Sequence, residues 1–232
     1  MRNLSFRDTL TIGLMLFALF FGAGNLVFPA MLGQNAGSQF LQANLGFLTT
    51  GVGLPLLGIM ALGFSGSQDL LALTNRVHPW FAFAYTTLLY LTIGPLFALP
   101  RTGSVSYEIG IKPFIGVEAG SLELAVFTVL FFGVTLLFSI NPNRMVDLVG
   151  KILTPVLLVS IMLLAAAAIA RPLGVPREPT PAYVSQPFFN GFQEGYLTMD
   201  ALAAFVFGII VINAIRAKGV AALRSMMVVS FQ

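Results

Sequence analysis

Residues 21–29 lie inside a long apolar run and read Phe21-Gly22-Ala23-Gly24-Asn25-Leu26-Val27-Phe28-Pro29. Glycine and asparagine are poor helix formers, each by up to about 1 kcal/mol relative to alanine. Pro29 has no N–H to donate to the carbonyl of Asn25, and its ring clashes with that carbonyl. These two effects predict a membrane-spanning helix over residues 9–32 that is interrupted at residues 22–25.

A break in the middle of a membrane leaves backbone amides and carbonyls unpaired, at several kcal/mol each in hydrocarbon. Such a break persists only beside a polar cavity or a bound ligand. The half-helix that ends near Gly22 directs carbonyls toward the break, and the half-helix that starts near Leu26 directs N–H groups toward it. This arrangement suits a zwitterion, and the side-chain oxygen of Asn25 suits a hard cation. The alternative is that Gly22 and Gly24 only permit close helix packing.

The composition around this stretch is typical of a polytopic membrane protein. Of the 232 residues, 57% are hydrophobic and only 9% are charged, with a mean hydropathy of +0.89. Soluble domains carry about 25% charged residues. A net charge of +3, scattered along the chain, excludes a nucleic-acid footprint. Because the chain has no Cys and one His, most thiol, zinc and histidine chemistry is excluded, and we expect no enzyme, catalytic residue or resident cofactor.

The uncharged runs set the number of spans. Between Asp8 and Asp69 lie 60 residues without a formal charge, enough for two helices that cross a membrane, and the polar patch 33–39 predicts the turn between them. Five prolines in 171–187 predict an outer loop, and Asn141-Pro142-Asn143 predicts a cytoplasmic turn. We expect one transmembrane domain over residues 1–232. Its predicted helices span 9–32, 41–64, 79–101, 122–140, 148–170 and 193–214, followed by the start of an incomplete seventh helix at 220–232.

The positions of lysine and arginine favour a cytoplasmic N-terminus. That orientation places eight of these residues on the inner side and four, Arg101, Lys112, Arg171 and Arg177, on the outer side. A cleaved signal peptide is the alternative, because Arg2 and Arg7 precede an apolar run and residues 23–25 resemble a cleavage site. The apolar sequence that resumes at Leu26, with five further spans after it, argues against cleavage.

Residues 21–29 resemble the first-helix signature of the branched-chain amino acid:cation symporter family. They are also similar to the Gly-Asn…Phe-Pro element of neurotransmitter-type sodium symporters, although the spacing from Asn25 to Pro29 is one residue shorter here. The resemblance extends to about residue 218 and includes Glu194-Gly195-Tyr196-Leu197-Thr198-Met199-Asp200-Ala201-Leu202-Ala203-Ala204. It implies an all-α polytopic membrane protein of LeuT-type (APC superfamily) architecture. In that architecture two five-helix repeats are inverted and helices 1 and 6 are discontinuous, and this chain holds the first repeat plus helix 6.

The resemblance directs the candidate site to the two helix breaks and the third helix. Asp200 is an ionisable residue inside a span and is therefore a functional candidate, although it could instead cap the second half of its helix. Tyr90 could contact the substrate or could be a packed residue or interface anchor, and Phe205 and Phe207 could wall an apolar pocket. The candidate substrate-binding residues are Gly22, Ala23, Gly24, Asn25, Leu26, Tyr90, Thr198 and Met199. The candidate coupling-ion residues are Ala23, Asn25 and Asp200.

The resemblance implies a secondary active transporter that imports Leu, Ile and Val across the bacterial inner membrane by symport with Na⁺. A proton carried through Asp200 or Glu194 is the rival coupling ion. An apolar pocket separates substrates that differ by one methylene by only about 1–3 kcal/mol, so we expect all three amino acids to be accepted. The expected partners are these small molecules and the lipid bilayer.

The length departs from the family pattern, because members have about twice this length and two complete repeats. The resemblance therefore favours a truncated form, and the alternatives are a non-transporting fragment or a self-assembling, channel-like or regulatory membrane protein. Self-association is expected only if the half-length chain is functional. A channel predicts polar stripes along whole helices, whereas polarity here is concentrated at the two breaks. An intramembrane enzyme would need a paired nucleophile and base at mid-membrane, and no such pair stands out.

Overall fold

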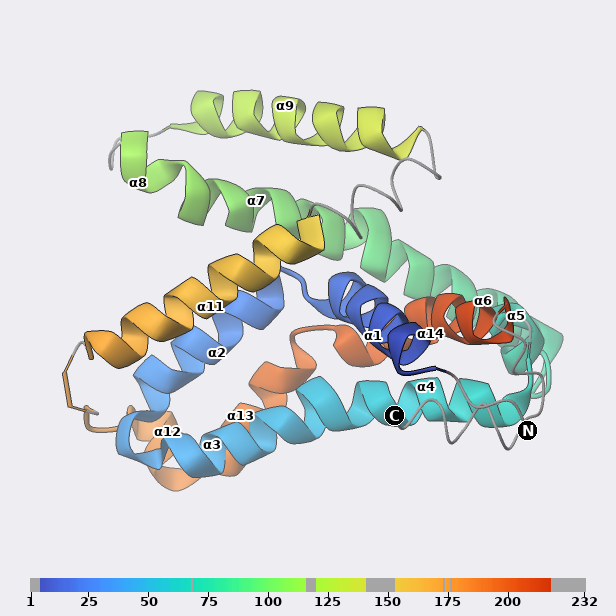
Figure 1. The fold of residues 1–232 in the computed structure, drawn as a ribbon, viewed down its shortest axis with the longest axis horizontal. Coiled ribbons are helices and arrows are strands. Elements are labelled where there is room, and N and C mark those ends of the chain that lie inside the picture. Colours follow the sequence, from blue (N-terminus) through green and yellow to red (C-terminus); the bar gives the residue numbers. More distant parts are fainter. Residues whose placement is uncertain are drawn as a thin grey trace. The chain divides into compact units, whose positions relative to one another are not determined.

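The computed structural model describes residues 5–67, 69–115, 120–140, 153–172, 174–175 and 177–217, and all regular structure within these ranges is helical (Figure 1). The chain divides into two compact units, described separately below. The first joins the described parts of Met1–Leu89 and Ala170–Gln232, and the second is Tyr90–Ile169.

Several helices are long and apolar enough to cross a membrane. In the described part of the chain, three continuous helical segments pass by length and composition, namely Ala23–Ser65, Pro79–Ile115 and Ser121–Ser139. The first of these contains the second half of the first predicted span and the whole of the second. A fourth candidate is the bent pair Pro187–Tyr196 and Asp200–Asn213, which is the sixth span in chain order. Two shorter apolar helices are Thr9–Phe20 and Thr154–Ala170. The chain is thus an all-helical, multi-pass membrane protein over its described residues.

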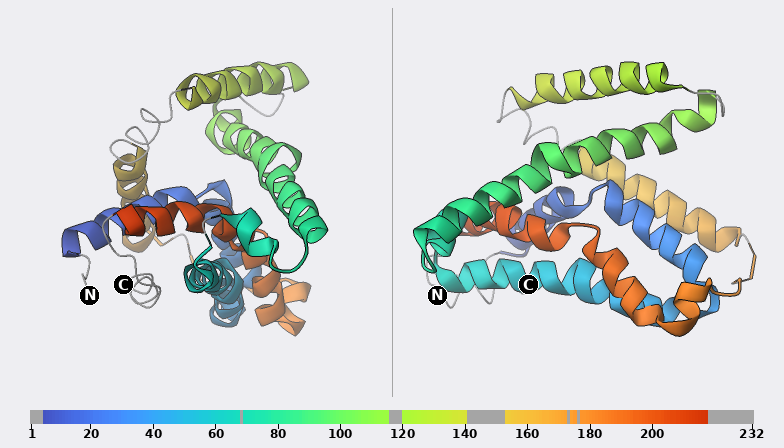
Figure 2. Two further views of the ribbon diagram at one scale, coloured as in Figure 1. Left: turned by 90° about the vertical axis from the view of Figure 1, so that its right-hand side faces the viewer. Right: turned by 180° about the vertical axis from the view of Figure 1, so that it is seen from behind.

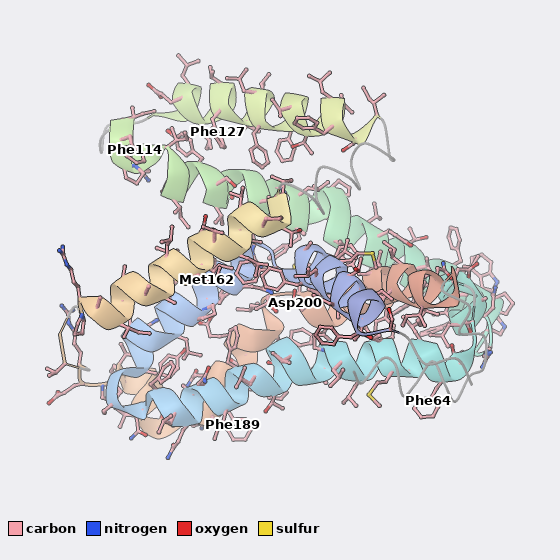
Figure 3. All side chains as sticks on the ribbon, viewed as in Figure 1. Phe64, Phe114, Phe127, Met162, Phe189 and Asp200 are labelled. Carbon is pink, nitrogen blue, oxygen red and sulfur yellow. The ribbon has the colours of Figure 1, made fainter. Side chains whose placement is uncertain are left out.

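Many large apolar side chains are exposed on the surface, as expected for a protein surrounded by lipid. Phe64, Phe114, Phe189 and Met162, labelled in Figure 3, are between 53% and 86% exposed. Helix α9 (Ser121–Ser139) has no buried residue although it is strongly apolar. Apolar surface on this scale is unfavourable in water and favourable against lipid.

The first span consists of two helices, α1 (Phe6–Phe20) and α2 (Ala23–Ala36). The interruption lies at residues 21–22 rather than over 22–25, because α2 already begins at Ala23. Gly22 has extended backbone (φ −101°, ψ −179°) and precedes the first turn of α2. Pro29 lies inside α2, and the helix continues through it to Ala36. The proline therefore removes a single hydrogen bond without ending the helix.

The turn after α2 is the 3₁₀ helix η1 (Gly37–Gln39), shorter than the predicted turn over 33–39. Gly37 has φ +48°, and a Cβ on it would overlap the carbonyl of Arg177. The Ser38 N–H donates to the Arg177 carbonyl (3.1 Å), and the Thr180 N–H donates to the Asn35 carbonyl (2.9 Å). The proline-rich segment therefore packs against this turn, and it contains a short helix, α12 (Pro181–Ser185).

The second span is continuous and consists of α3 (Phe40–Leu48), the π-helical turn η2 (Thr49–Gly53) and α4 (Leu54–Ser65). Pro55 cannot donate to the carbonyl of Gly51, which favours a widened turn at this point. A short helix, α5 (Leu70–Thr74), follows, and its first turn is capped by the Asp69 carboxylate, which accepts from the Ala72 N–H (2.6 Å).

The sixth span is broken, as expected for helix 6, into α13 (Pro187–Tyr196) and α14 (Asp200–Ala217), which are bent by 42° (Figure 2). The span begins at Pro187, six residues before the predicted start at 193. Proline is favoured in the first turn of a helix, where its missing N–H has no intrahelical partner. The end of the proline-rich segment is therefore the start of this span.

The second span supports both halves of the sixth. On the face that α3 turns toward α13, a Cβ on Gly46 would overlap the Phe188 carbonyl, and a Cβ on Gly191 would overlap the Ala43 carbonyl. Farther along, a Cβ on Gly58 would lie 3.0 Å from Cβ of Ala204, at the contact between α4 and α14. Small residues at these points let the helix backbones approach closely, as in other membrane helix pairs (Figure 2).

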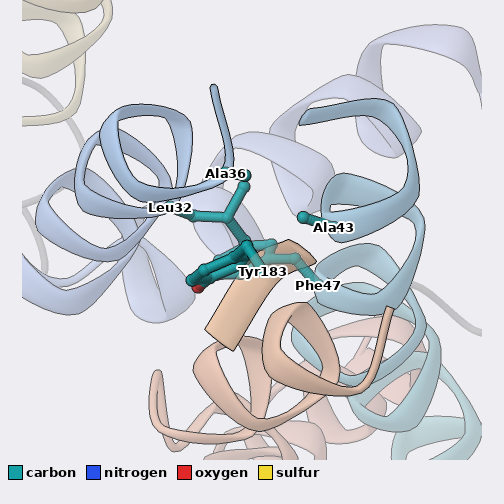
Figure 4. Packing of buried hydrophobic residues seen from close by; sticks show 5 residues of the cluster. All are labelled: Leu32, Ala36, Ala43, Phe47 and Tyr183. Carbon is teal, nitrogen blue, oxygen red and sulfur yellow. The ribbon is translucent and has the colours of Figure 1, made fainter. Parts of the chain in front are cut away.

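Two buried clusters hold the first unit together. One contains Leu32, Ala36, Ala43, Phe47 and Tyr183, from α2, α3 and α12 (Figure 4). Burial of Tyr183, and then the charge of Glu194, raise the pKa of this phenol, so it stays neutral in the cluster. The other contains Leu62, Val211, Ile212 and Ile215, and the α1 residues Ile12, Met15 and Leu16 pack against it.

The remaining helices complete the third to fifth spans. Helix α6 (Pro79–Leu91) leads through the π-helical turn η3 (Thr92–Leu96) into α7 (Ala98–Gly110) and α8 (Lys112–Ile115). The helical segment that begins at Pro79 does not end at 101 as predicted, because it bends at Gly94 (ψ −119°) and continues to Ile115. Helices α9 and α11 (Thr154–Ala170) occupy the predicted fourth and fifth spans. The predicted turn 141–143 and the predicted seventh helix at 220–232 lie outside the described residues.

We expect Gly191→Ala to lower the free energy of unfolding by about 1–3 kcal/mol, because the added methyl group must separate the backbones of α13 and α3. Thermal unfolding of the purified chain in detergent measures the change. The matched control is Gly33→Ala in α2, where the added Cβ meets nothing within 4 Å apart from the neighbouring backbone of its own helix. Equal melting temperatures for both variants would contradict close packing of α13 on α3.

Candidate substrate and ion site

A side-chain hydrogen bond joins the two helix breaks. The amide nitrogen Nδ2 of Asn25, in the first turn of α2, donates to carboxylate oxygen Oδ2 of Asp200, the first residue of α14, at 2.7 Å. The two residues are 175 positions apart in the sequence. Asp200 is only 7% exposed, and Figure 3 shows it beside the end of α1. A hydrogen bond to a buried carboxylate is among the stronger ones in proteins.

Asn25 also closes the break in its own span. Its Nδ2 donates to the carbonyl of Phe20, the last residue of α1, at 3.0 Å, and its backbone N–H donates to the Gly22 carbonyl at 3.1 Å. One amide group thus holds the carbonyl end of α1, the start of α2 and the start of α14 in one place. Ala23 and Gly24 occupy the first two positions of α2, where backbone N–H groups have no intrahelical partner.

Thr198 and Met199 shape the break in the sixth span. The Thr198 hydroxyl donates to the carbonyl of Gly195 at 2.8 Å and accepts from the Asp200 N–H at 3.4 Å. Met199 has φ +68°, a left-handed conformation that costs a non-glycine residue roughly 1–2 kcal/mol. Its carbonyl accepts from the N–H groups of Leu202 and Ala203, which begins α14. Strained backbone of this kind concentrates at functional sites.

The predicted site residues fall into two groups. Asn25 and Asp200 are in direct contact, and Gly22, Ala23, Gly24, Leu26, Thr198 and Met199 belong to the two segments that this contact joins. Asp200 is the first residue of α14, one position after the N-cap, and its negative charge is favourable at the positive end of that helix. Tyr90 belongs to the second unit, and its side chain is 50% exposed. Its contact with a substrate stays a prediction.

Tyr85 is a residue of this region that the sequence did not indicate. Its ring lies edge-on to that of Phe205 in α14, with the centroids 6.5 Å apart, and the Phe20 and Phe207 rings meet in the same way at 5.6 Å. Aromatic side chains from α1, α6 and α14 therefore lie close to the two breaks. Because the chain has 22 Phe and 5 Tyr, nothing in the sequence separates Tyr85 from the other rings.

The chemistry of this site is that of one carboxylate, one amide and the ends of interrupted helices. Among the described residues, no group of three or more His, Cys, Asp or Glu side chains could hold a metal ion. Oxygen ligands and a single negative charge suit a hard monovalent cation or an ammonium group better than a transition metal.

The family model described as "Branched-chain amino acid transport protein" matches residues 5–232. The chain belongs to this family. It is 58% identical to the branched-chain amino acid permease BrnQ of Bacillus subtilis over 218 residues, which cover 94% of this chain and 50% of that protein. No solved structure matches the chain.

Two further relatives have the same pattern. The branched-chain amino acid permease BraB of Bacillus subtilis is 53% identical over 94% of this chain and 49% of its own length. The permease BrnQ of Escherichia coli K12 is 43% identical over 92% of this chain and 48% of its own length. The chain thus spans about half the length of the curated relatives it matches. These relatives are named as permeases, which are transport proteins and not enzymes.

A double-mutant cycle tests the contact between the two breaks. Asn25→Ala and Asp200→Ala each remove one partner, and we expect their effects on the free energy of unfolding to deviate from additivity by about 1–3 kcal/mol. Denaturant-induced unfolding of the purified chain in detergent measures each value. Asn25→Ala combined with Ser65→Ala is the control, because the Ser65 hydroxyl donates to Leu62 within its own helix. Additive effects for Asn25 and Asp200 would show that the side chains do not interact.

Proposed function

We propose that this polypeptide acts in the import of branched-chain amino acids, driven by the symport of Na⁺. In this proposal it is a secondary active transporter of LeuT-type architecture in the bacterial inner membrane, with a cytoplasmic N-terminus. The observation that carries the proposal is the hydrogen bond between Asn25 and Asp200, which joins the breaks of two interrupted spans. The names of the permeases that the chain is similar to supply the substrate class.

The substrate backbone fits the charges at the joined breaks. The first amides of α2, at Ala23 and Gly24, form the positive end of that helix and would bind the amino acid carboxylate. The carbonyl end of α1 at Phe20 would bind the ammonium group. Broken helices in transporters bind zwitterions with this polarity.

The substrate side chain requires an apolar wall. Leu26 and Met199 lie at the two breaks, and the rings of Phe205, Phe207 and Tyr85 lie near them. Such a wall distinguishes side chains by size and not by one methylene. Leu, Ile and Val are therefore the expected substrates, and a charged side chain is excluded by the cost of its desolvation.

The coupling ion fits the same region. Na⁺ would be bound by the Asp200 carboxylate, the side-chain oxygen of Asn25 and the backbone of Ala23. Because Asp200 is buried, a cation that neutralises it lowers the electrostatic cost of the site. Substrate and cation then favour the binding of each other, and this coupling is reciprocal. A proton on Asp200 is the alternative cation.

Uptake of radiolabelled leucine into transport-deficient bacteria that express the 232-residue chain tests the proposal. We expect uptake that depends on an inward Na⁺ gradient and that unlabelled isoleucine and valine inhibit. Asn25→Ala should lower uptake by at least about tenfold at equal abundance in the membrane, because it removes a hydrogen bond to a buried carboxylate. The matched control is Ser160→Ala in α11, whose hydroxyl bonds within its own helix.

Each result of the uptake experiment decides one part of the proposal. Uptake driven by a proton gradient without Na⁺ would replace Na⁺ by a proton as the coupling ion. Uptake that Asn25→Ala leaves unchanged would contradict a site at the joined breaks. Absence of leucine uptake by a chain that is inserted in the membrane would contradict transport by this polypeptide.

A further inference from the structure

Thr50 is the most enclosed polar side chain among the described residues of this membrane protein. It lies in the π-helical turn η2 and is 0% exposed. Its hydroxyl donates to the carbonyl of Phe192 in α13 at 2.7 Å, across 142 positions of sequence, and makes a longer contact of 3.4 Å with the Phe47 carbonyl of its own helix. The shorter of the two bonds is the one between helices.

The neighbouring Thr49 shows how a threonine hydroxyl in this turn is otherwise satisfied. Its hydroxyl donates to the carbonyl of Leu45, four residues earlier in the same helix, at 2.8 Å, and its side chain is exposed. A buried hydroxyl needs a partner, and an intrahelical carbonyl supplies one. Thr50 differs from Thr49 because its shorter hydrogen bond is made to a different helix, α13.

The contact leaves no room for a substitute donor. A Cβ on Gly195, in the last turn of α13, would overlap both the Thr50 hydroxyl and the Phe47 carbonyl. The backbone of α13 thus lies directly against η2 where Thr50 donates. No side chain fits between the two helices at position 195, so the polar contact at this point is the hydrogen bond from the Thr50 hydroxyl to the backbone of α13.

The end of α13 that Thr50 holds is connected to the proposed site. Gly195, three residues after Phe192, accepts from the Thr198 hydroxyl, which in turn accepts from the Asp200 N–H. The Asp200 carboxylate then accepts from Asn25. A displacement of the last turn of α13 therefore changes the position of the Asp200 carboxylate relative to the break in the first span.

From this arrangement we infer that Thr50 is a positioning residue of the proposed site, acting through α13 and Thr198 on Asp200. This inference rests on the proposed function for its effect on leucine affinity, but its structural effect is measurable without transport. The widened turn η2 explains why a residue of the second span can serve in this way. It turns Thr50 toward α13, while Gly58 of α4 meets α14 beyond it.

The experiment uses the absence of cysteine in the chain, which permits labelling at one introduced thiol. Leu197→Cys, at the C-terminal cap of α13, is 46% exposed and carries a trifluoromethyl label, whose fluorine resonance is recorded for the purified chain in detergent. We expect Thr50→Val, which keeps the shape and removes the donor, to shift or split this resonance by more than its linewidth. Thr50→Ser should restore it, and Thr49→Val should leave it unchanged.

The same samples are titrated with leucine in the presence of Na⁺. We expect Thr50→Val to raise the apparent Kd for leucine by about fivefold, the effect of one net hydrogen bond, and Thr50→Ser to raise it less than about twofold. A fluorine resonance in Thr50→Val identical to that of the parent chain, or one that Thr50→Ser does not restore, would overturn the inference. A normal leucine Kd in Thr50→Val would also overturn it.

The two proposals fail in different ways. If leucine leaves the resonance of the labelled parent chain unchanged, the proposed function is contradicted. The comparison of Thr50→Val, Thr50→Ser and Thr49→Val without leucine still decides whether the hydroxyl positions α13. If leucine binds but only Thr49→Val shifts the resonance, the positioning residue is Thr49 and the inference about Thr50 is wrong.

Discussion

Every backbone polar group that lies in hydrocarbon must find a partner, and this constraint determines the first unit of the structure. The chain interrupts two spans and then satisfies the freed groups locally. The Asn25 amide binds the carbonyl end of α1, and the Thr198 hydroxyl binds the carbonyl of Gly195 near the end of α13. The bond from Asn25 to Asp200 then joins the two breaks, so polar groups from both spans meet in one place.

The contact between Asn25 and Asp200 depends on the second span, a continuous helix that packs against both halves of the sixth span. The second span crosses without interruption and contacts both halves of the sixth, through Gly46, Gly191 and Gly195 on one side of η2 and through Gly58 on the other. Contacts between helix backbones resist displacement because no flexible side chain lies between them. An interrupted helix lacks backbone hydrogen bonds at the break and can bend there. Packing of both halves against the second span fixes the angle between them.

The sequence predicted those features that arise from local chemistry. The low helix propensity of residues 22–25 is a property of the residues themselves, so the first break was expected near its observed place. The break before Asp200 was expected from the family resemblance instead. The extension of α2 through Pro29, the start of the sixth span at Pro187 and the ring contact of Tyr85 were not predicted. The ring contact of Tyr85 depends on packing between segments distant in the sequence, which a local pattern does not record. The start at Pro187, in contrast, has a local signal, because proline is favoured in the first turn of a helix.

The unfavourable conformations at the site are maintained by contacts between segments that are distant in the sequence. Met199 in a left-handed conformation and a carboxylate at Asp200 that is 7% exposed both oppose folding. A continuous helix with neither a left-handed residue nor a buried carboxylate would be more stable locally. They persist because the contacts of α13 with α3 and of α14 with α4 fix the residues on either side of the break, which leaves Met199 and Asp200 no relaxed alternative. In the proposed function, these contacts hold the Asp200 carboxylate in its cation-binding position before any cation binds. The free energy of cation binding is then not reduced by the entropy lost on ordering the site.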